Sequence, residues 1–154
     1  MRSCVLVLLL LLTASGCGGP PGDQGLVHRI SSRVESGAVV DLADLAPFVW
    51  PRVHVFEPYT TEADAEQQMG VAWPDEWPWS AVETLDDRTF LVFVRDSAIV
   101  SAFDYLRVDG DFASEPLDAP DGLSPEAARF DVLFKGDGSA ALVPEAVTPS
   151  ESEE

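Results

Sequence analysis

Five consecutive apolar residues, Phe90–Val94, set the strongest limit on the architecture of this chain. Side chains alternate between the two faces of a strand, so a strand without polar positions needs an apolar layer on both faces. Residues 95–97 (Arg-Asp-Ser) then turn the chain into a second strand, Ala98–Leu106, and this pair is the clearest hairpin in the sequence. Three apolar residues of the second strand are predicted to share one face: Ile99, Phe103 and Tyr105.

Further strands are predicted on both sides of this hairpin. Arg52–Phe56 alternates valine with other residues, which is typical of a strand with one inward face. Phe130–Lys135 and Ser139–Val143 flank residues 136–138 (Gly-Asp-Gly) and predict a second hairpin. Val39–Leu45 fits either a strand or a helical turn, because its alternation is imperfect.

Two short helices are predicted, one before the strands and one among them. Apolar residues recur at helical spacing over residues 26–34, which predicts a helix over about residues 25–36. Thr61 can cap a second helix over Glu62–Met69, and Gly70 suits the carboxyl end of that helix.

These elements predict an α+β fold: an antiparallel sheet of about four to six strands with two short helices packed on one face. The strands follow one another through short turns, which argues against parallel β–α–β units. A single domain is expected over residues 26–145. Residues 146–154 are expected to form a disordered acidic tail, because the last six residues include no apolar side chain.

The first sixteen residues have the parts of a bacterial signal peptide. Arg2 supplies one positive charge before Cys4–Leu12, an unbroken apolar run of nine residues. A helix that spans a membrane needs about 20 residues, so this run is too short for a permanent span. Small residues at positions 13–16 (Thr-Ala-Ser-Gly) then lead directly to Cys17.

Residues 13–17 resemble the lipobox of bacterial lipoproteins. The resemblance implies cleavage before Cys17 and acylation of its thiol, and usually of the new amino terminus, with fatty acids such as palmitate. One departure is Ala14, where the family most often has leucine. The alternative is an ordinary secretory signal peptide with a cysteine at the cleavage site by chance.

A lipid anchor would place the mature chain outside the cytoplasm, on a membrane of the cell envelope. Two or three acyl chains hold a protein stably, whereas one chain alone is marginal. Residues 17–25 are then the lipidated cysteine and a flexible tether, whose eight residues after Cys17 have a typical reach of about 15 Å. Gly18 lacks the aspartate that favours retention in the inner membrane, which leaves the outer membrane open in a Gram-negative cell.

The mature chain is strongly acidic. Loss of Arg2 leaves eight of the nine Lys and Arg residues against 27 Asp and Glu residues. Such a surface repels nucleic-acid phosphates and anionic lipid headgroups, so no nucleic-acid partner is expected. The protein is therefore expected to be held to the membrane by its lipid anchor and not by its surface charge. Of the two cysteines, Cys4 leaves with the signal peptide and Cys17 is acylated, so no disulfide supports the domain.

The sequence provides few candidates for catalysis or metal binding. The two histidines are His28, on the first helix, and His54, expected as a polar residue on the outer face of its strand. Neither a Gly-x-Ser-x-Gly motif nor a free cysteine accompanies them, so no catalytic residue is assigned. No His/Cys cluster indicates zinc, and no cofactor is expected. Four acidic residues near glycines lack EF-hand spacing and are interpreted as turn residues: Asp109, Asp111, Glu115 and Asp137.

The aromatic residues give the one candidate surface. Three of the four tryptophans, Trp73, Trp77 and Trp79, fall in a proline-interrupted stretch that cannot form regular structure. If they are exposed, they can stack on a sugar, a peptide or a lipid interface; if they fold back, they cover the core, which is the favoured interpretation. Tyr59, after Pro58, either presents its hydroxyl in a cleft or holds the turn.

A longer string around this turn also resembles known proteins. Residues 50–60 (Trp-Pro-Arg-Val-His-Val-Phe-Glu-Pro-Tyr-Thr), with Gly70 and the Phe90–Val94 strand, resemble a group of small uncharacterised bacterial lipoproteins. The resemblance covers about residues 38–107 and implies no activity. At the level of the fold there is a looser likeness to small envelope lipoproteins of the outer-membrane-assembly and β-lactamase-inhibitor type.

Two functions remain open at this point. The first is a lipid-anchored, non-catalytic module that binds an envelope protein or glycan through the edge formed by Tyr59, Trp73, Trp77 and Trp79. The second is a hydrolase of envelope glycan that uses carboxylates such as Asp75 and Glu76. The second function requires two carboxyl groups about 5 to 9 Å apart in a pocket, one of them with a raised pKa.

Overall fold

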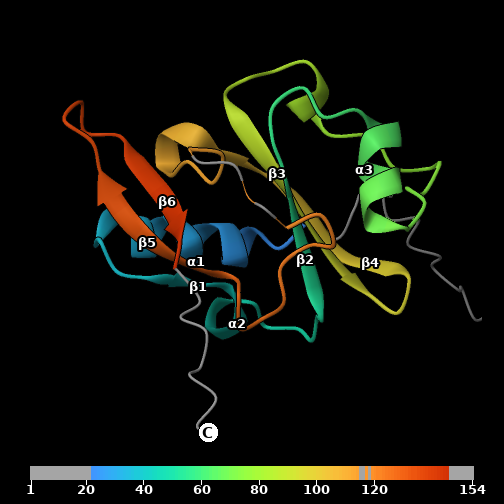
Figure 1. Ribbon diagram of the computed structural model, residues 1–154, viewed down its shortest axis with the longest axis horizontal. Helices are drawn as coiled ribbons and strands as arrows, with labels where there is room; N and C mark the ends of the chain where they lie inside the picture. Colours follow the sequence, from blue (N-terminus) through green and yellow to red (C-terminus); the bar gives the residue numbers. More distant parts are fainter. Residues whose placement is uncertain (1–21, 115–116, 118, 146–154) are drawn as a thin grey trace, which may run out of the picture.

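The structure is a computed structural model that describes residues 22–114, 117 and 119–145, and Figure 1 shows their arrangement. The signal peptide, Cys17 and the acidic tail lie outside the described residues, so their predicted roles stay predictions. The elements in chain order are α1 (Gln24–Glu35), β1 (Val40–Asp41), α2 (Leu42–Leu45), β2 (Arg52–Phe56), α3 (Glu62–Met69), η1 (Ala81–Glu83), β3 (Arg88–Arg95), β4 (Ala98–Leu106), η2 (Arg107–Asp109), β5 (Arg129–Phe134) and β6 (Ala140–Pro144).

The six strands form two antiparallel sheets of three strands each, with the orders β1–β5–β6 and β2–β3–β4. The predicted α+β class is therefore confirmed, but the prediction of one sheet is wrong. Two backbone links outside the six strands, at Asp111 and Leu123, each involve one of the two sheets. Asp111 pairs with Ala141 of β6, and Leu123 exchanges two backbone hydrogen bonds with Val53 of β2, at 3.0 and 2.8 Å.

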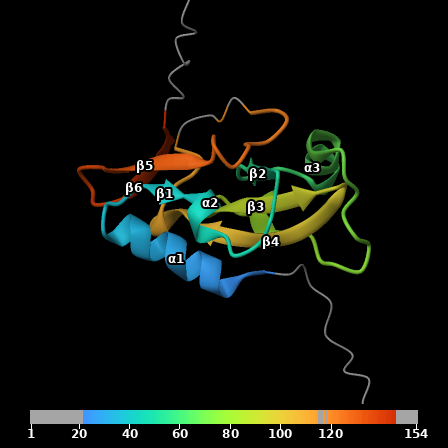
Figure 2. The same ribbon diagram turned by 90° about the horizontal axis from the view of Figure 1, so that it is seen from below.

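β3 separates two apolar cores, as its unbroken apolar sequence predicted. Residues 90–94 are all buried, and their side chains alternate between the cores. The first core joins α1, the β1–β5–β6 sheet and one face of the β2–β3–β4 sheet (Figure 2). The second core lies on the opposite face of β3 and includes Ala65 of α3 and Trp73, with Trp77 and Trp79 packed against it. The two longer helices thus cover opposite faces of the β2–β3–β4 sheet, and the prediction that both pack on one face is wrong.

Local sequence signals place the helix ends as expected. The Asp23 carboxylate accepts a hydrogen bond of 3.0 Å from the Leu26 amide and so caps α1. Thr61 caps α3 in the same way, and Gly70 ends that helix with φ 66°. Since α1 begins at Gln24, the last residues of the predicted tether belong to the folded domain instead. Within the described part of the chain, the helices are all too short or too polar to cross a membrane.

The register of β3 and β4 corrects one further prediction, and the structure resolves one that was left open. A bulge between Phe93 and Val94 places Ile99 opposite Val94, on the second core, whereas Phe103 and Tyr105 face the first core. The three residues therefore do not share one face. The ambiguous segment 39–45 contains both predicted structures, a short strand followed by a helical turn.

Candidate binding surface

The turn between β2 and α3 presents Tyr59 to solvent in an unusual backbone conformation. Tyr59 has φ 70° and its side chain is 63% exposed. Its amide donates a hydrogen bond of 2.7 Å to the carbonyl oxygen of Val82, in η1. The hydroxyl of Thr60 donates to the carbonyl oxygen of Glu57 at 2.7 Å. Hydrogen bonds at Tyr59 and at the residue after it therefore hold the turn in place.

The tryptophan loop, residues 73–79, is partly core and partly surface. Trp73 is only 3% exposed; its amide donates to Glu66 at 2.6 Å and its indole Nε1 donates to the Trp77 carbonyl at 3.1 Å. The Trp73 ring makes edge-on contacts with Trp77 and Trp79, at centroid distances of 5.7 and 5.1 Å. Trp73 is therefore a core residue, and its assignment to a binding surface is wrong.

Trp77 and Trp79 are half-buried and pack against the second core. The favoured interpretation of the loop as core cover is thus correct for Trp73 and partly so for its two neighbours. Trp79 is followed by η1, whose Val82 holds the Tyr59 amide, so the turn and the loop meet at one end of the molecule. We call Tyr59, Trp77 and Trp79 the aromatic end.

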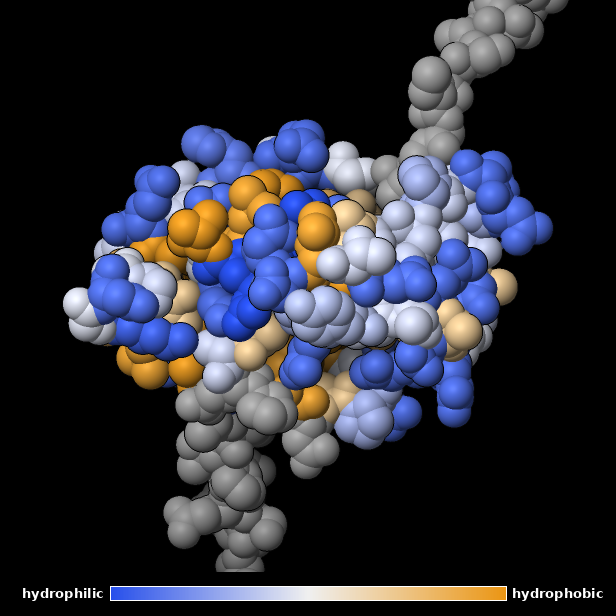
Figure 3. Space-filling model, turned by 90° about the horizontal axis from the view of Figure 1, so that it is seen from above, coloured by the Kyte–Doolittle hydropathy of each residue, from blue (hydrophilic) through white to orange (hydrophobic). Residues whose placement is uncertain are grey.

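The surface of the domain is mixed in character. Figure 3 shows one face, on which apolar side chains gather in patches that hydrophilic side chains divide. The exposed apolar residues belong to separate elements, among them Val49 before β2, Val108 in η2 and Phe134 in β5. Exposure alone therefore does not mark a site, and backbone strain is what distinguishes Tyr59.

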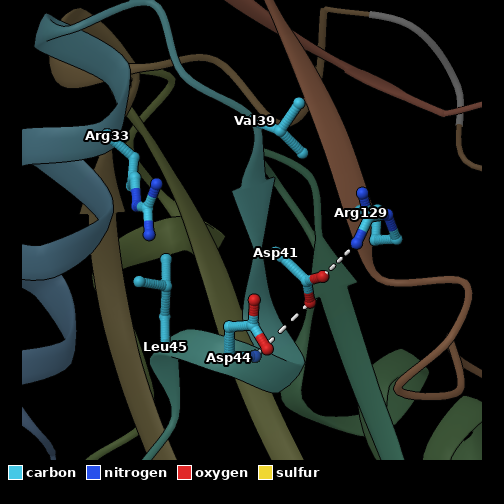
Figure 4. A pocket seen from close by; sticks show the side chains of 6 residues that line it. All are labelled: Arg33, Val39, Asp41, Asp44, Leu45 and Arg129. Atoms are coloured by element: carbon cyan, nitrogen blue, oxygen red, sulfur yellow. Dashed lines mark hydrogen bonds and ion pairs between the residues drawn. The ribbon is translucent and has the colours of Figure 1, made fainter.

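A polar pocket of about 140 Å³ lies between α1 and the β1–α2 segment (Figure 4). The Asp41 carboxylate in its wall accepts hydrogen bonds from the Ala43 and Asp44 amides, at 3.0 and 3.4 Å, and pairs with Arg129. Arg129 also pairs with Glu145 at 2.7 Å. Asp41 thus makes all these contacts as an acceptor, which is a structural role and not that of a general acid.

The structure does not support the hypothesis of a carboxylate hydrolase at Asp75 and Glu76. Asp75 and Glu76 are both exposed in the tryptophan loop. Every carboxyl pKa shift that is resolved among the described residues is downward, as for Asp137, where hydrogen bonds from Ser139 lower the pKa. A general acid needs a raised pKa, so none of these shifts marks one.

Two of the acidic residues that superficially suggest calcium, Asp111 and Asp137, have other partners, and Glu115 lies outside the described residues. Asp111 receives two hydrogen bonds from the Arg107 guanidinium, at 2.9 and 2.8 Å. Burial raises the pKa of Asp111, but hydrogen bonds from Arg107 and the Ala113 amide outweigh it, so the net shift is downward. Asp137 accepts from the amide and hydroxyl of Ser139, which is a turn role. In the part of the chain that is described, no three His, Cys, Asp or Glu side chains are grouped to hold a metal ion.

His54 is the buried polar residue that the sequence did not reveal. It is 3% exposed, against the prediction of an outer face, and its ring stacks on Phe56 at a centroid distance of 5.9 Å. Among the described residues its Nδ1 atom has no hydrogen-bond partner. Burial, and after it the charge of Arg52, lower the pKa of His54, while Asp121 acts in the opposite direction.

No protein-family model, no curated protein and no solved structure matches this chain. The lipobox resemblance, the resemblance around residues 50–60 and the likeness to small envelope lipoproteins therefore remain predictions from the sequence. Apart from the acylation of Cys17 that the lipobox resemblance implies, none of them adds a residue role, so the case for a binding function rests on the geometry of the aromatic end.

Proposed function

We propose that this protein is a lipid-anchored protein of the bacterial cell envelope whose domain is a non-catalytic module that binds an envelope protein or glycan through the aromatic end. The anchor is supported by the sequence of residues 1–17, in which an apolar run too short to span a membrane leads to a lipobox-like cysteine. The binding role is supported by the geometry of the described residues.

The observation that carries the binding role is the strained, exposed conformation of Tyr59. A left-handed conformation costs a residue with a β-carbon about 1–2 kcal/mol, and glycine would adopt it freely. The exposed ring of Tyr59 recovers little of this cost from packing. Strained residues cluster at ligand-binding sites, where the surroundings hold a side chain in one place. A tyrosine fixed in this way offers a large amphipathic contact at a low cost in side-chain entropy.

The charge of the chain limits which classes of partner are expected. With a formal net charge of −18, the chain repels polyanions, so we expect no nucleic-acid partner. Aromatic rings such as those of Tyr59 and Trp77 stack on the apolar faces of sugar rings and on peptide side chains. We therefore expect a neutral or basic partner, either a glycan or a protein surface.

The anchor is tested by metabolic labelling with a fatty-acid analogue, with Cys17→Ser as the control. Labelled wild type and unlabelled Cys17→Ser are expected, because the thiol of Cys17 is the proposed site of acylation. A wild-type protein that takes up no label would contradict the anchor.

The binding role is tested by crosslinking the protein in its own envelope and identifying what is captured, with Tyr59→Gly beside the wild type. Glycine adopts φ 70° without strain, so this variant removes the ring while the turn is expected to remain folded. Loss of the captured partner in Tyr59→Gly, with an unchanged thermal midpoint, would support the proposal. Equal capture by both proteins would contradict it, and Val108→Gly serves as the control for loss of an exposed side chain elsewhere.

A further inference from the structure

The described chain begins near the β3–β4 hairpin. Gly22 lines a shallow depression with Phe48 and Val100, and Phe48 contacts Phe93 near the end of β3. Gln24, the first residue of α1, lines the same depression as Val100 and Ser101 of β4. The residues where the chain enters the domain are therefore fixed at one end of the β2–β3–β4 sheet.

An exposed apolar side chain and two exposed arginines lie at the same end. Val49 is 72% exposed, although it adjoins the buried Trp50. The strand register places Arg52 opposite Val94, which adjoins Arg95 at the hairpin turn. Among the described residues, neither arginine forms an ion pair with a carboxylate; Arg52 makes a long hydrogen bond, 3.5 Å, to the carbonyl oxygen of Asp121. We call Gly22, Phe48, Val49, Arg52 and Arg95 the hairpin end.

The two arginines of the hairpin end can attract anions although the chain as a whole is acidic. Arg52 and Arg95 are both exposed, and neither has an ion pair among the described residues. Their guanidinium groups are therefore available to lipid phosphates at close range, where the screened repulsion from distant carboxylates is small.

The length of chain between the proposed anchor and the domain limits which end can face the bilayer. Five residues separate Cys17 from the folded chain, counted through Gly22, and they span at most about 18 Å when fully extended. The 12 residues of α1 extend for about 18 Å and end near Val108 and Phe134. An anchor at Cys17 thus keeps the hairpin end within about 18 Å of the membrane, whereas the far end of α1 lies one helix length further along the chain.

We propose that the hairpin end is a membrane-contact surface: Val49 enters the headgroup layer, and Arg52 and Arg95 bind the phosphates of phospholipids. This inference rests on the proposed lipid anchor and specifies how the domain sits on it. Both guanidinium groups can donate to phosphate oxygens, and a single exposed valine adds a small apolar contribution. β2 runs from Arg52 at this end to Phe56 before the Tyr59 turn, so the contact directs the aromatic end away from the bilayer.

The experiment uses the lipidated protein in vesicles of phosphatidylcholine with phosphatidylglycerol. Because Cys17 is acylated and Cys4 leaves with the signal peptide, Val49→Cys provides one free thiol for a polarity-sensitive fluorophore. Val108→Cys, at a position 78% exposed beside the far end of α1, is the matched control. A blue shift and quenching by a headgroup-attached quencher are expected at residue 49 and not at residue 108.

Charge reversal tests the arginine contacts. Arg95→Glu is expected to weaken headgroup quenching at residue 49, whereas Lys135→Glu, the same charge change at the tip of the β5–β6 hairpin, is expected to leave it unchanged. An equal loss in both variants would overturn the phosphate contact.

The remaining outcomes distinguish a failure of the lipid anchor from a failure of the proposed orientation of the domain. Acylated protein with equal water exposure at residues 49 and 108 would overturn this inference and leave the anchor intact. Residue 49 shielded from water without lipid quenching would indicate a protein partner at this end and would also overturn it. Protein that takes up no fatty acid would overturn the anchor and this inference together.

Discussion

Gly122 lies against the imidazole ring of His54, so closely that a β-carbon at residue 122 would stand 2.9 Å from the Cε1 and Nε2 atoms. The same β-carbon would lie 3.0 Å from the Val53 carbonyl oxygen. Gly122 has φ 77°, a conformation that favours glycine. Two hydrogen bonds between Leu123 and Val53 fix the loop in this position. The loop thus covers a buried histidine with a residue that no other amino acid can replace without strain.

Gly122→Ala is therefore expected to lower the free energy of unfolding by about 2 kcal/mol or more, from the clash and the backbone strain together. Gly136→Ala is the control, because a β-carbon there would meet nothing within 4 Å. Urea unfolding of both variants measures the difference. Equal urea midpoints for the two variants would show that a β-carbon at residue 122 does not clash with His54.

The lowered pKa of His54 predicts a loss of stability on acidification. Burial, and then Arg52, keep the folded-state pKa below the unfolded value of about 6.5, so the unfolded chain binds a proton more readily. This contribution to stability is fully present above about pH 6.5 and is lost as the pH falls toward the folded-state pKa. In His54→Phe, the free energy of unfolding should fall less between pH 7.5 and pH 5.5 than in the wild type. If the free energy of unfolding had the same pH dependence in both proteins, the lowered pKa of His54 would be contradicted.

Features encoded within a few residues could be predicted from the sequence. Both hairpins, the capping of α3 by Thr61 and its end at Gly70 follow from local side-chain chemistry. The two apolar faces of β3 follow from residues 90–94 alone. The positive φ of Tyr59 could not be inferred from its residue type, because this conformation favours glycine and is rare for a residue with a β-carbon.

Features that depend on distant contacts were missed for a physical reason. His54 looks like an outer-face residue within β2, and only the loop at Gly122, far along the chain, buries it. The division into two sheets depends on which strands pair, which the alternation pattern does not encode. Ile99 changes face because one bulge residue shifts the register of β4, and nothing within Ala98–Leu106 marks that position.

The two-residue turn of the β3–β4 hairpin is a site for stabilisation. Asp96 and Ser97 have φ 50° and 62°, the combination of a type I′ turn, for which Asn-Gly is preferred. Asp96→Asn combined with Ser97→Gly is expected to raise stability by about 0.5–1 kcal/mol. Thermal unfolding measures the change, and Ser97→Val, a β-branched residue at positive φ, should lower the midpoint. A lower midpoint for the Asn-Gly variant would contradict the turn geometry.

Trp73 and Tyr59 test the division between core and surface at the aromatic end. Trp73→Ala removes a buried ring that contacts three other aromatic rings and is expected to cost about 3–5 kcal/mol. Tyr59→Gly removes an exposed ring and relieves positive φ, so its stability should equal or exceed that of the wild type. Chemical unfolding of both variants gives the comparison. A large loss in Tyr59→Gly would mean that the ring stabilises the turn, and its exposure would then no longer favour a binding role over a structural one.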